Sequence, residues 1–190
     1  VAGVMIGWLG KVELASHQVI LSVSTLGILL YYGTGAAISI RVSHFFGRRD
    51  MKGVRRTTAA GVQLMAAMSV VICGAFLTLR PFMGRIFNAP PEVAAIVSVL
   101  MLILLTLQVG DVFQVTYANA LRGMNDVTSM AAISFVGYFV LALPLCYLFG
   151  FTLHGGIVGI WWGFPVGLLA AGLMMMGRFR YLTKNRETHG

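Results

Sequence analysis

Residues 104–126 read LLTLQVGDVFQVTYANALRGMND, and they place one carboxylate, Asp111, deep inside a long apolar run. A charged side chain at the centre of a lipid bilayer costs roughly 2.5–3.5 kcal/mol on insertion scales. Such a residue therefore faces the interior of the protein or a water-filled cavity, and Asp111 is the first candidate for a functional side chain.

The composition of the whole chain is typical of a membrane protein. Of the 190 residues, 58% are hydrophobic and only 11% are charged, whereas soluble domains carry about 25% charged residues. The two cysteines, Cys73 and Cys146, each lie within an apolar run. Their positions indicate neither a disulfide framework nor a metal site.

Apolar runs along the chain predict an all-α polytopic membrane protein, because a spanning helix needs about 20 mostly apolar residues. Since its first residues are already apolar, we expect the chain to be a piece of a longer protein that begins within a helix. Ser16 is predicted to cap the start of a helix, and Pro81 to end one. The predicted segments are a partial helix at residues 1–9, five complete spanning helices at 16–46, 57–79, 93–120, 128–150 and 157–179, and a tail at 180–190.

Prolines and glycines inside these helices indicate how the helices bend and pack. Pro144 and Pro165 should each bend a helix and free a carbonyl one turn earlier, either for packing or as a bending point during transport. In the last helix, Gly159, Gly163 and Gly167 recur at every fourth position, which lets two helix backbones approach closely. We expect this row to pack within the molecule, and a dimer face is the alternative.

Lys and Arg are distributed unequally between the two ends of the predicted helices, with eleven at one end and three at the other. The positive-inside rule places the richer end in the cytoplasm, which makes residues 180–190 a cytoplasmic tail. The net charge of +8 is thereby explained by topology, and no nucleic-acid partner is expected. The eleven are Arg41, Arg48, Arg49, Lys52, Arg55, Arg56, Arg122, Arg178, Arg180, Lys184 and Arg186, and the three are Lys11, Arg80 and Arg85.

The helix predicted at 93–120 has a polar face. On a helical wheel, Gln108, Asp111 and Asn119 lie within about 80° of each other, and Gln114 lies about 60° from Asp111. The amides could serve only to bond neighbouring helices together. Asp111 fits that role poorly, because an amide or a hydroxyl would serve it without the cost of a charge. A carboxylate at this depth instead suits the exchange of a proton or a metal cation.

Tyr31 and Tyr32, on the helix predicted at 16–46, are candidates for lining a substrate cavity, because an aromatic face attracts a cationic ligand. Packing, or contact with the lipid interface, is the alternative. The four histidines share no spacing typical of a metal site. The sequence contains no nucleophile motif, phosphate loop or pair of catalytic carboxylates.

Six short motifs occur in a fixed order: WLG at 8–10, LASHQ at 14–18, GAAISIRV at 35–42, DVFQ at 111–114, ALRGMND at 120–126 and LPLCYL at 143–148. Together they resemble the multidrug and toxic compound extrusion (MATE) family of transporters, and the resemblance covers essentially the whole chain. It implies twelve helices in two six-helix lobes. This chain would supply the second lobe, as five complete helices and the end of another.

The resemblance also implies a function. The family comprises secondary active antiporters of the inner membrane, which export organic cations and other drugs in exchange for sodium ions or protons and need no cofactor. The expected partners are membrane lipids, the organic cations and the N-terminal lobe. Asp111 matches the cation-binding Asp of the family's second lobe and would be the sodium ligand in a sodium-coupled member. Gln108 and Gln114 match nearby polar positions, and Gln114, Asn119, Tyr31 and Tyr32 are the candidates for the substrate cavity.

Three other functions stay open at this point. A lipid or lipid-linked-sugar flippase of the same superfamily is favoured by basic residues inside the membrane, but residues 57–79 and 93–121 contain no Lys or Arg. A membrane-embedded enzyme needs a second catalytic group beside Asp111, and none is evident at that depth. A structural scaffold is the third alternative.

Overall fold

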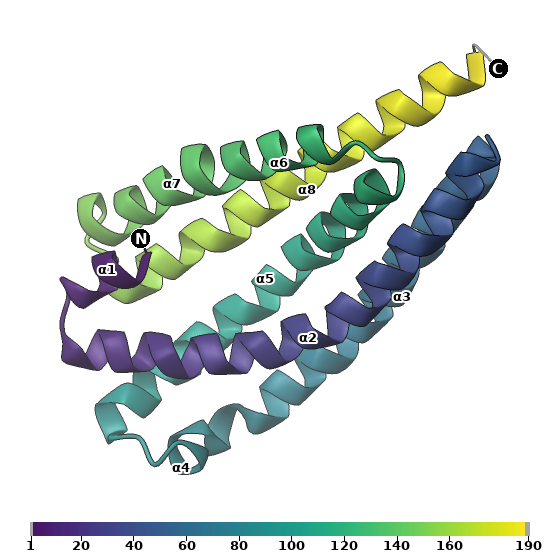
Figure 1. Ribbon diagram of the computed structural model, residues 1–190. Coiled ribbons are helices and arrows are strands. Elements are labelled where there is room, and N and C mark those ends of the chain that lie inside the picture. Colours follow the sequence, from purple (N-terminus) through teal and green to yellow (C-terminus); the bar gives the residue numbers. More distant parts are fainter. Residues whose placement is uncertain (1, 189–190) are drawn as a thin grey trace.

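The computed structural model describes residues 2–188, and the regular structure of these residues is helical (Figure 1). Five stretches are long and apolar enough to cross a membrane, which confirms the predicted all-α polytopic fold. In chain order the elements are α1 (Ala2–Gly7), α2 (Lys11–Gly47), α3 (Met51–Leu79), the 3₁₀ turn η1 (Arg80–Phe82), α4 (Met83–Ile86), α5 (Pro91–Gly123), α6 (Val127–Phe135), the π-helical η2 (Val136–Ala142), α7 (Leu143–Tyr147), the π-helical η3 (Leu148–Thr152) and α8 (Gly156–Thr188).

Helix α5 lies at the centre of the bundle. It packs against α2 and α3 on one side and against α8 on the other, and α8 in turn carries the segment from α6 to η3 on its outer flank (Figure 1). Large apolar side chains such as Leu26, Val70 and Phe139 are exposed on the outside. This is expected where lipid tails, which are as apolar as Leu, replace water as the solvent.

Helix α2 begins at Lys11, five residues before the predicted start at Ser16. Gly10, at φ 150°, supplies the break that precedes it. Ser16 therefore lies inside the helix, where its hydroxyl donates a hydrogen bond to the carbonyl oxygen of Val12 at 2.8 Å. Its predicted role as an N-cap is wrong, because the residues that follow Gly10 already continue as helix.

Helices α3 and α8 are also longer than the apolar runs indicate. The side chain of Asp50 accepts a hydrogen bond from the backbone N–H of Gly53 at 2.8 Å, which caps α3 so that it begins at Met51 rather than at residue 57. Helix α8 continues to Thr188, although a tail was predicted from residue 180. Residues 178–188 contain neither Gly nor Pro, so nothing in that stretch ends the helix.

The fifth membrane-spanning stretch is not a uniform α-helix. It alternates between the α-helical α6 and α7 and the π-helical η2 and η3. Pro144 lies in the first turn of α7, directly after η2, and it has no N–H to bond to a carbonyl one turn earlier. Pro165, by contrast, lies inside α8, which is continuous. The backbone irregularity thus surrounds Pro144 and not Pro165.

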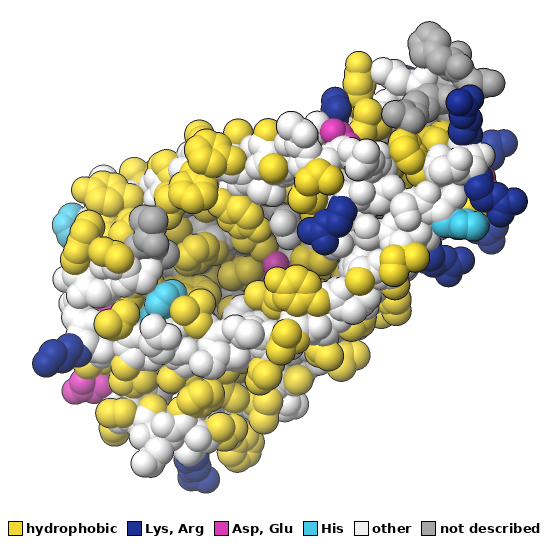
Figure 2. Space-filling view, viewed as in Figure 1, with side chains coloured by type: hydrophobic (Ala, Val, Ile, Leu, Met, Phe, Trp, Pro, Cys, Tyr) yellow, Lys and Arg dark blue, Asp and Glu magenta, His cyan; other side chains and the backbone are white. Residues whose placement is uncertain are grey.

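One end of the bundle, here called the basic end, holds the α2–α3 turn (48–50), the α5–α6 turn (124–126) and the last turns of α8. Figure 2 shows Lys and Arg side chains gathered mainly at this end. There the Nε of Arg178, on α8, donates to the Oδ2 of Asp126 at 2.8 Å, and the Ser129 hydroxyl donates to its Oδ1 at 2.7 Å. The hydrogen bond from Arg178 is the main reason that the pKa of Asp126 lies below its ordinary value. This pair ties α8 to the α5–α6 turn.

Candidate functional site

Asp111 lies in the middle part of α5, where the helix is surrounded by α2, α3 and α8. Its side chain is only 8% exposed. Among the residues that the structure describes, no hydrogen-bond donor or cation is paired with its carboxylate. The site therefore holds a buried acid whose charge is not compensated by a neighbouring side chain.

Gln108 lies one turn before Asp111 on α5 and is held in place from α2. The hydroxyl of Tyr31 donates to the Oε1 of Gln108 at 2.9 Å, and both side chains are buried. Gly27, one turn before Tyr31, leaves room for the Gln108 amide, since a Cβ at position 27 would lie 3.3 Å from its Nε2. Ser69 on α3 interacts with the same Tyr31 hydroxyl. Side chains from three helices thus fix Gln108 beside the carboxylate.

Tyr138 adds a fourth segment of the chain to the site. It lies on η2, close enough to Asp111 and Tyr32 for its hydroxyl to interact with both electrostatically. Tyr32 is 67% exposed. Figure 2 shows that the face between α2 and α8 is hollowed and lined mainly by hydrophobic side chains, with an acidic side chain at the bottom. Tyr31 is therefore part of the buried hydrogen-bonded cluster, while Tyr32 is available at the surface.

The other two polar candidates on α5 have no described hydrogen bond to this cluster. The Nδ2 of Asn119 donates to the backbone carbonyl of Val115 at 2.8 Å and lies against Gly35 of α2. Gln114 is half-buried, and its backbone lies against Gly172 of α8. No interaction described in the structure joins either side chain to Asp111.

The glycine row of α8 faces the segment from η2 to η3. A Cβ at Gly159 would collide with the carbonyl oxygen of Phe149, and one at Gly167 would collide with Ala142. Between them, a Cβ at Gly163 would come within 2.7 Å of the Cys146 backbone nitrogen. The structure thus places the row at a contact within the chain. The close packing holds η2, and with it Tyr138, against α8.

The cluster offers oxygen atoms from a carboxylate, an amide and phenols, which suit a proton or a hard cation better than a soft metal. Sequence reasoning selected Gln108, Asp111 and Tyr31, but it missed Ser69 and Tyr138. Both are polar side chains inside strongly apolar stretches, and that contrast could have identified them as candidates. A single helical wheel cannot show that residues on α3 and η2 converge on a residue of α5.

The comparison with known proteins places this arrangement in a family. The MatE family model matches residues 1–148. The chain belongs to the MATE family. Members of this family are membrane transporters and not enzymes. The chain is 38% identical over 182 residues to the multidrug resistance protein MdtK of Pectobacterium atrosepticum, and the match covers 93% of the chain and 39% of that relative.

Solved MATE structures share the fold. An inward-facing conformation of a multidrug resistance MATE family transporter of the MOP superfamily matches with a TM-score of 0.86 at 14% identity, covering 93% of this chain and 41% of that one. An outward-facing conformation of a multidrug resistance MATE family transporter of the MOP superfamily matches with a TM-score of 0.87 at 13% identity, and the match covers 98% of this chain and 44% of that one. The chain thus spans about two fifths of the length of the proteins it matches.

Proposed function

We propose that this chain forms the second lobe of a secondary active antiporter that exports organic cations and other drugs in exchange for sodium ions or protons. The observation that carries the proposal is Asp111, a carboxylate that is 8% exposed and has no compensating partner among the described residues. A charge in such a place is costly unless a proton or a cation is bound to it. Asp111 is therefore the proposed site of the coupling ion, with Gln108 beside it.

The neighbours of Asp111 have distinct roles in this proposal. Tyr31 orients Gln108 through the 2.9 Å hydrogen bond, so that the amide stays within reach of an ion bound at the carboxylate. Tyr32 on α2 and Tyr138 on η2 lie close enough to interact electrostatically, and they offer aromatic rings to an organic cation. Gln114 and Asn119 remain candidates for contacts with substrate further along α5.

Binding of the coupling ion would be linked to transport through motion of whole lobes. The chain resembles an inward-facing and an outward-facing MATE structure about equally well, with TM-scores of 0.86 and 0.87. This similarity supports a lobe that keeps its shape while it rocks against the first lobe around a site near the midplane. The excess of Lys and Arg at the basic end supports a cytoplasmic location for that end in the inner membrane.

The test is drug efflux by the full-length parent protein in proteoliposomes, with an imposed sodium or proton gradient. Asp111→Asn keeps the size of the side chain and removes its charge, so gradient-driven efflux should be abolished while the protein still inserts. Glu92→Gln is the matched control, because Glu92 is an exposed acid in the first turn of the same helix. The gradient that drives efflux identifies the ion. Unchanged efflux by Asp111→Asn, or equal loss in both variants, would contradict the proposal.

A further inference from the structure

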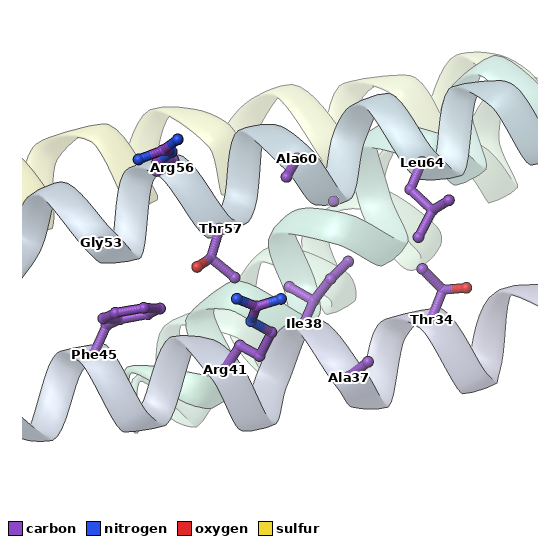
Figure 3. A pocket seen from close by; sticks show the side chains of 11 residues that line it. Thr34, Ala37, Ile38, Arg41, Phe45, Gly53, Arg56, Thr57, Ala60 and Leu64 are labelled. Carbon is purple, nitrogen blue, oxygen red and sulfur yellow. The ribbon is translucent and has the colours of Figure 1, made fainter.

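A second cavity, separate from the Asp111 site, lies between α2 and α3 near the basic end (Figure 3). Its volume is about 450 Å³. In Figure 3, α2 and α3 form its two walls, with α5 and α8 behind them, so the cavity opens away from the centre of the bundle.

Small side chains create this space. Ala37 on α2 and Ala60 on α3 line it and fill little of the gap between the two helices. At Gly61 a Cβ would lie 2.6 Å from the Cδ1 of Ile38, so the two helices meet closely at this point of the cavity wall. Leu64 adds to an interior that is mainly apolar.

The charge in this cavity is of one sign. Arg41 and Arg56 line it, and no Asp or Glu does. Figure 3 shows Arg41 reaching from α2 toward Thr57 on α3. The nearby acid Asp50 accepts the hydrogen bond of the Gly53 N–H and caps α3. No ion pair described in the structure involves either arginine. The positive charge therefore favours an anion over an organic cation here.

The two arginines lie at similar distances from the ends of their helices at the basic end. Arg41 precedes the end of α2 by six residues and Arg56 follows the start of α3 by five, which at 1.5 Å per residue is about 9 Å and 7.5 Å from the helix ends. Helix α2 has 37 residues and is about 55 Å long, whereas the hydrocarbon core is about 30 Å thick. The guanidinium groups therefore lie near the lipid headgroups, with the apolar part of the cavity deeper.

We propose that this cavity binds one anionic phospholipid. Its phosphate lies against the Arg41 guanidinium with the Thr57 hydroxyl as a further donor, Arg56 adds positive charge at the edge of the cavity, and an acyl chain lies along Ala37, Ala60 and Leu64. Basic pockets between membrane helices on the cytoplasmic side bind such headgroups, and Arg is suited to phosphate because its donors form a planar fork. This site is independent of the coupling ion and of drug recognition.

The test is lipid retention by the purified full-length parent in detergent, where the surface potential of a bilayer no longer contributes. Native mass spectrometry counts the phosphatidylglycerol and phosphatidylcholine that stay bound after washing with an equimolar mixture. The variant R41Q/R56Q should retain roughly tenfold less phosphatidylglycerol, since the charge-assisted contact of Arg41 and the nearby positive charge of Arg56 are both lost. The control R48Q/R49Q removes the same charge from the adjacent turn, outside the cavity, and should stay close to wild type.

A second variant tests the acyl-chain part of the site. Ala60→Phe keeps both arginines and fills the apolar cavity, so it should also lower retention, while soluble glycerol phosphate should not displace the lipid from the wild type. Equal loss in R48Q/R49Q, or equal retention of phosphatidylcholine, would overturn the proposal. Displacement by glycerol phosphate would show a simple anion site and overturn it as well. If the first lobe of the protein fills the cavity instead, retention will be the same in all variants, which also contradicts the proposal.

Discussion

Replacing Gly163 by Ala tests whether the glycine row of α8 holds the broken helix in place. A Cβ at this position would lie 2.5 Å from the Cys146 sulfur, 2.7 Å from its backbone nitrogen and 2.9 Å from its Cα. The sulfur can rotate away, but the backbone atoms can only move with the whole helix. Overpacking of this kind costs about 1–3 kcal/mol.

Gly177→Ala is the matched control. It makes the same change in the same helix, but a Cβ there would have no neighbour within 4 Å. Both variants gain up to about 1 kcal/mol from the better helix propensity of Ala. The difference between them therefore isolates the steric cost, which corresponds to roughly 2–12 °C in Tm for a unit of this size.

The assay is thermal unfolding of the full-length parent in detergent, followed by the fraction of protein that remains monodisperse after heating. Gly163→Ala should unfold at a lower temperature than Gly177→Ala, and Gly177→Ala at or above the wild-type temperature. Equal unfolding temperatures for the two variants would refute the reasoning. They would mean that α8 and the segment from η2 to η3 are not packed as closely as the structure shows.

Two further predictions concern hydrogen bonds between helices. Tyr31→Phe should lower stability by about 0.6 kcal/mol, the average for such bonds in a membrane protein, and by about 1.7 kcal/mol at most. It should also raise the ion concentration that gives half-maximal efflux, whereas Tyr147→Phe, at an exposed ring, should do neither. An unchanged ion dependence in Tyr31→Phe would show that Gln108 does not act on the ion. Asp126→Asn should cost about 1 kcal/mol at neutral pH. Because Arg178 holds the pKa of Asp126 below its ordinary 3.8, the stabilisation is complete above that pH and is lost as the pH falls through the lowered pKa. The Tm difference between wild type and Asp126→Asn should therefore disappear in strong acid, and a difference that persists there would exclude the charge of Asp126 as its source.

The spanning helices could be predicted from the sequence because apolar length is what a bilayer requires of a helix. Their ends could not, since helices continue beyond the hydrocarbon region wherever no residue stops them. Ser16 shows this at one end of the bundle and residues 180–188 at the other. The π-helical segments were also missed, because apolar length and composition do not distinguish a π-helical turn from an α-helical one.

The part of the candidate site that could be predicted is the part with polar or charged side chains on an otherwise apolar helix. Asp111 stands out in any apolar run, and Gln108 shares its face of the helix. The partner of Gln108 could not be identified, because Tyr31 and Tyr32 are adjacent in sequence and only the packing decides which one turns inward. The helical wheel also did not show that the side-chain amide of Asn119, on the same polar face, donates its hydrogen bond to the carbonyl of Val115 one turn earlier and not to a residue of the cluster.

The π-helical turns of the fifth span affect how this protein should be aligned with its relatives. A π turn is equivalent to an α-helix with one residue inserted, so each one rotates the rest of the helix by about 100° relative to a regular α-helix. Residues on the two sides of η2 therefore do not follow a common helical wheel, and Phe135 and Leu143 cannot be assigned to faces by a single 3.6-residue repeat. A relative whose fifth span is regular should therefore align with a one-residue gap within 136–142 and another within 148–152. Each gap would mark a change in helical phase and not a loss of the helix.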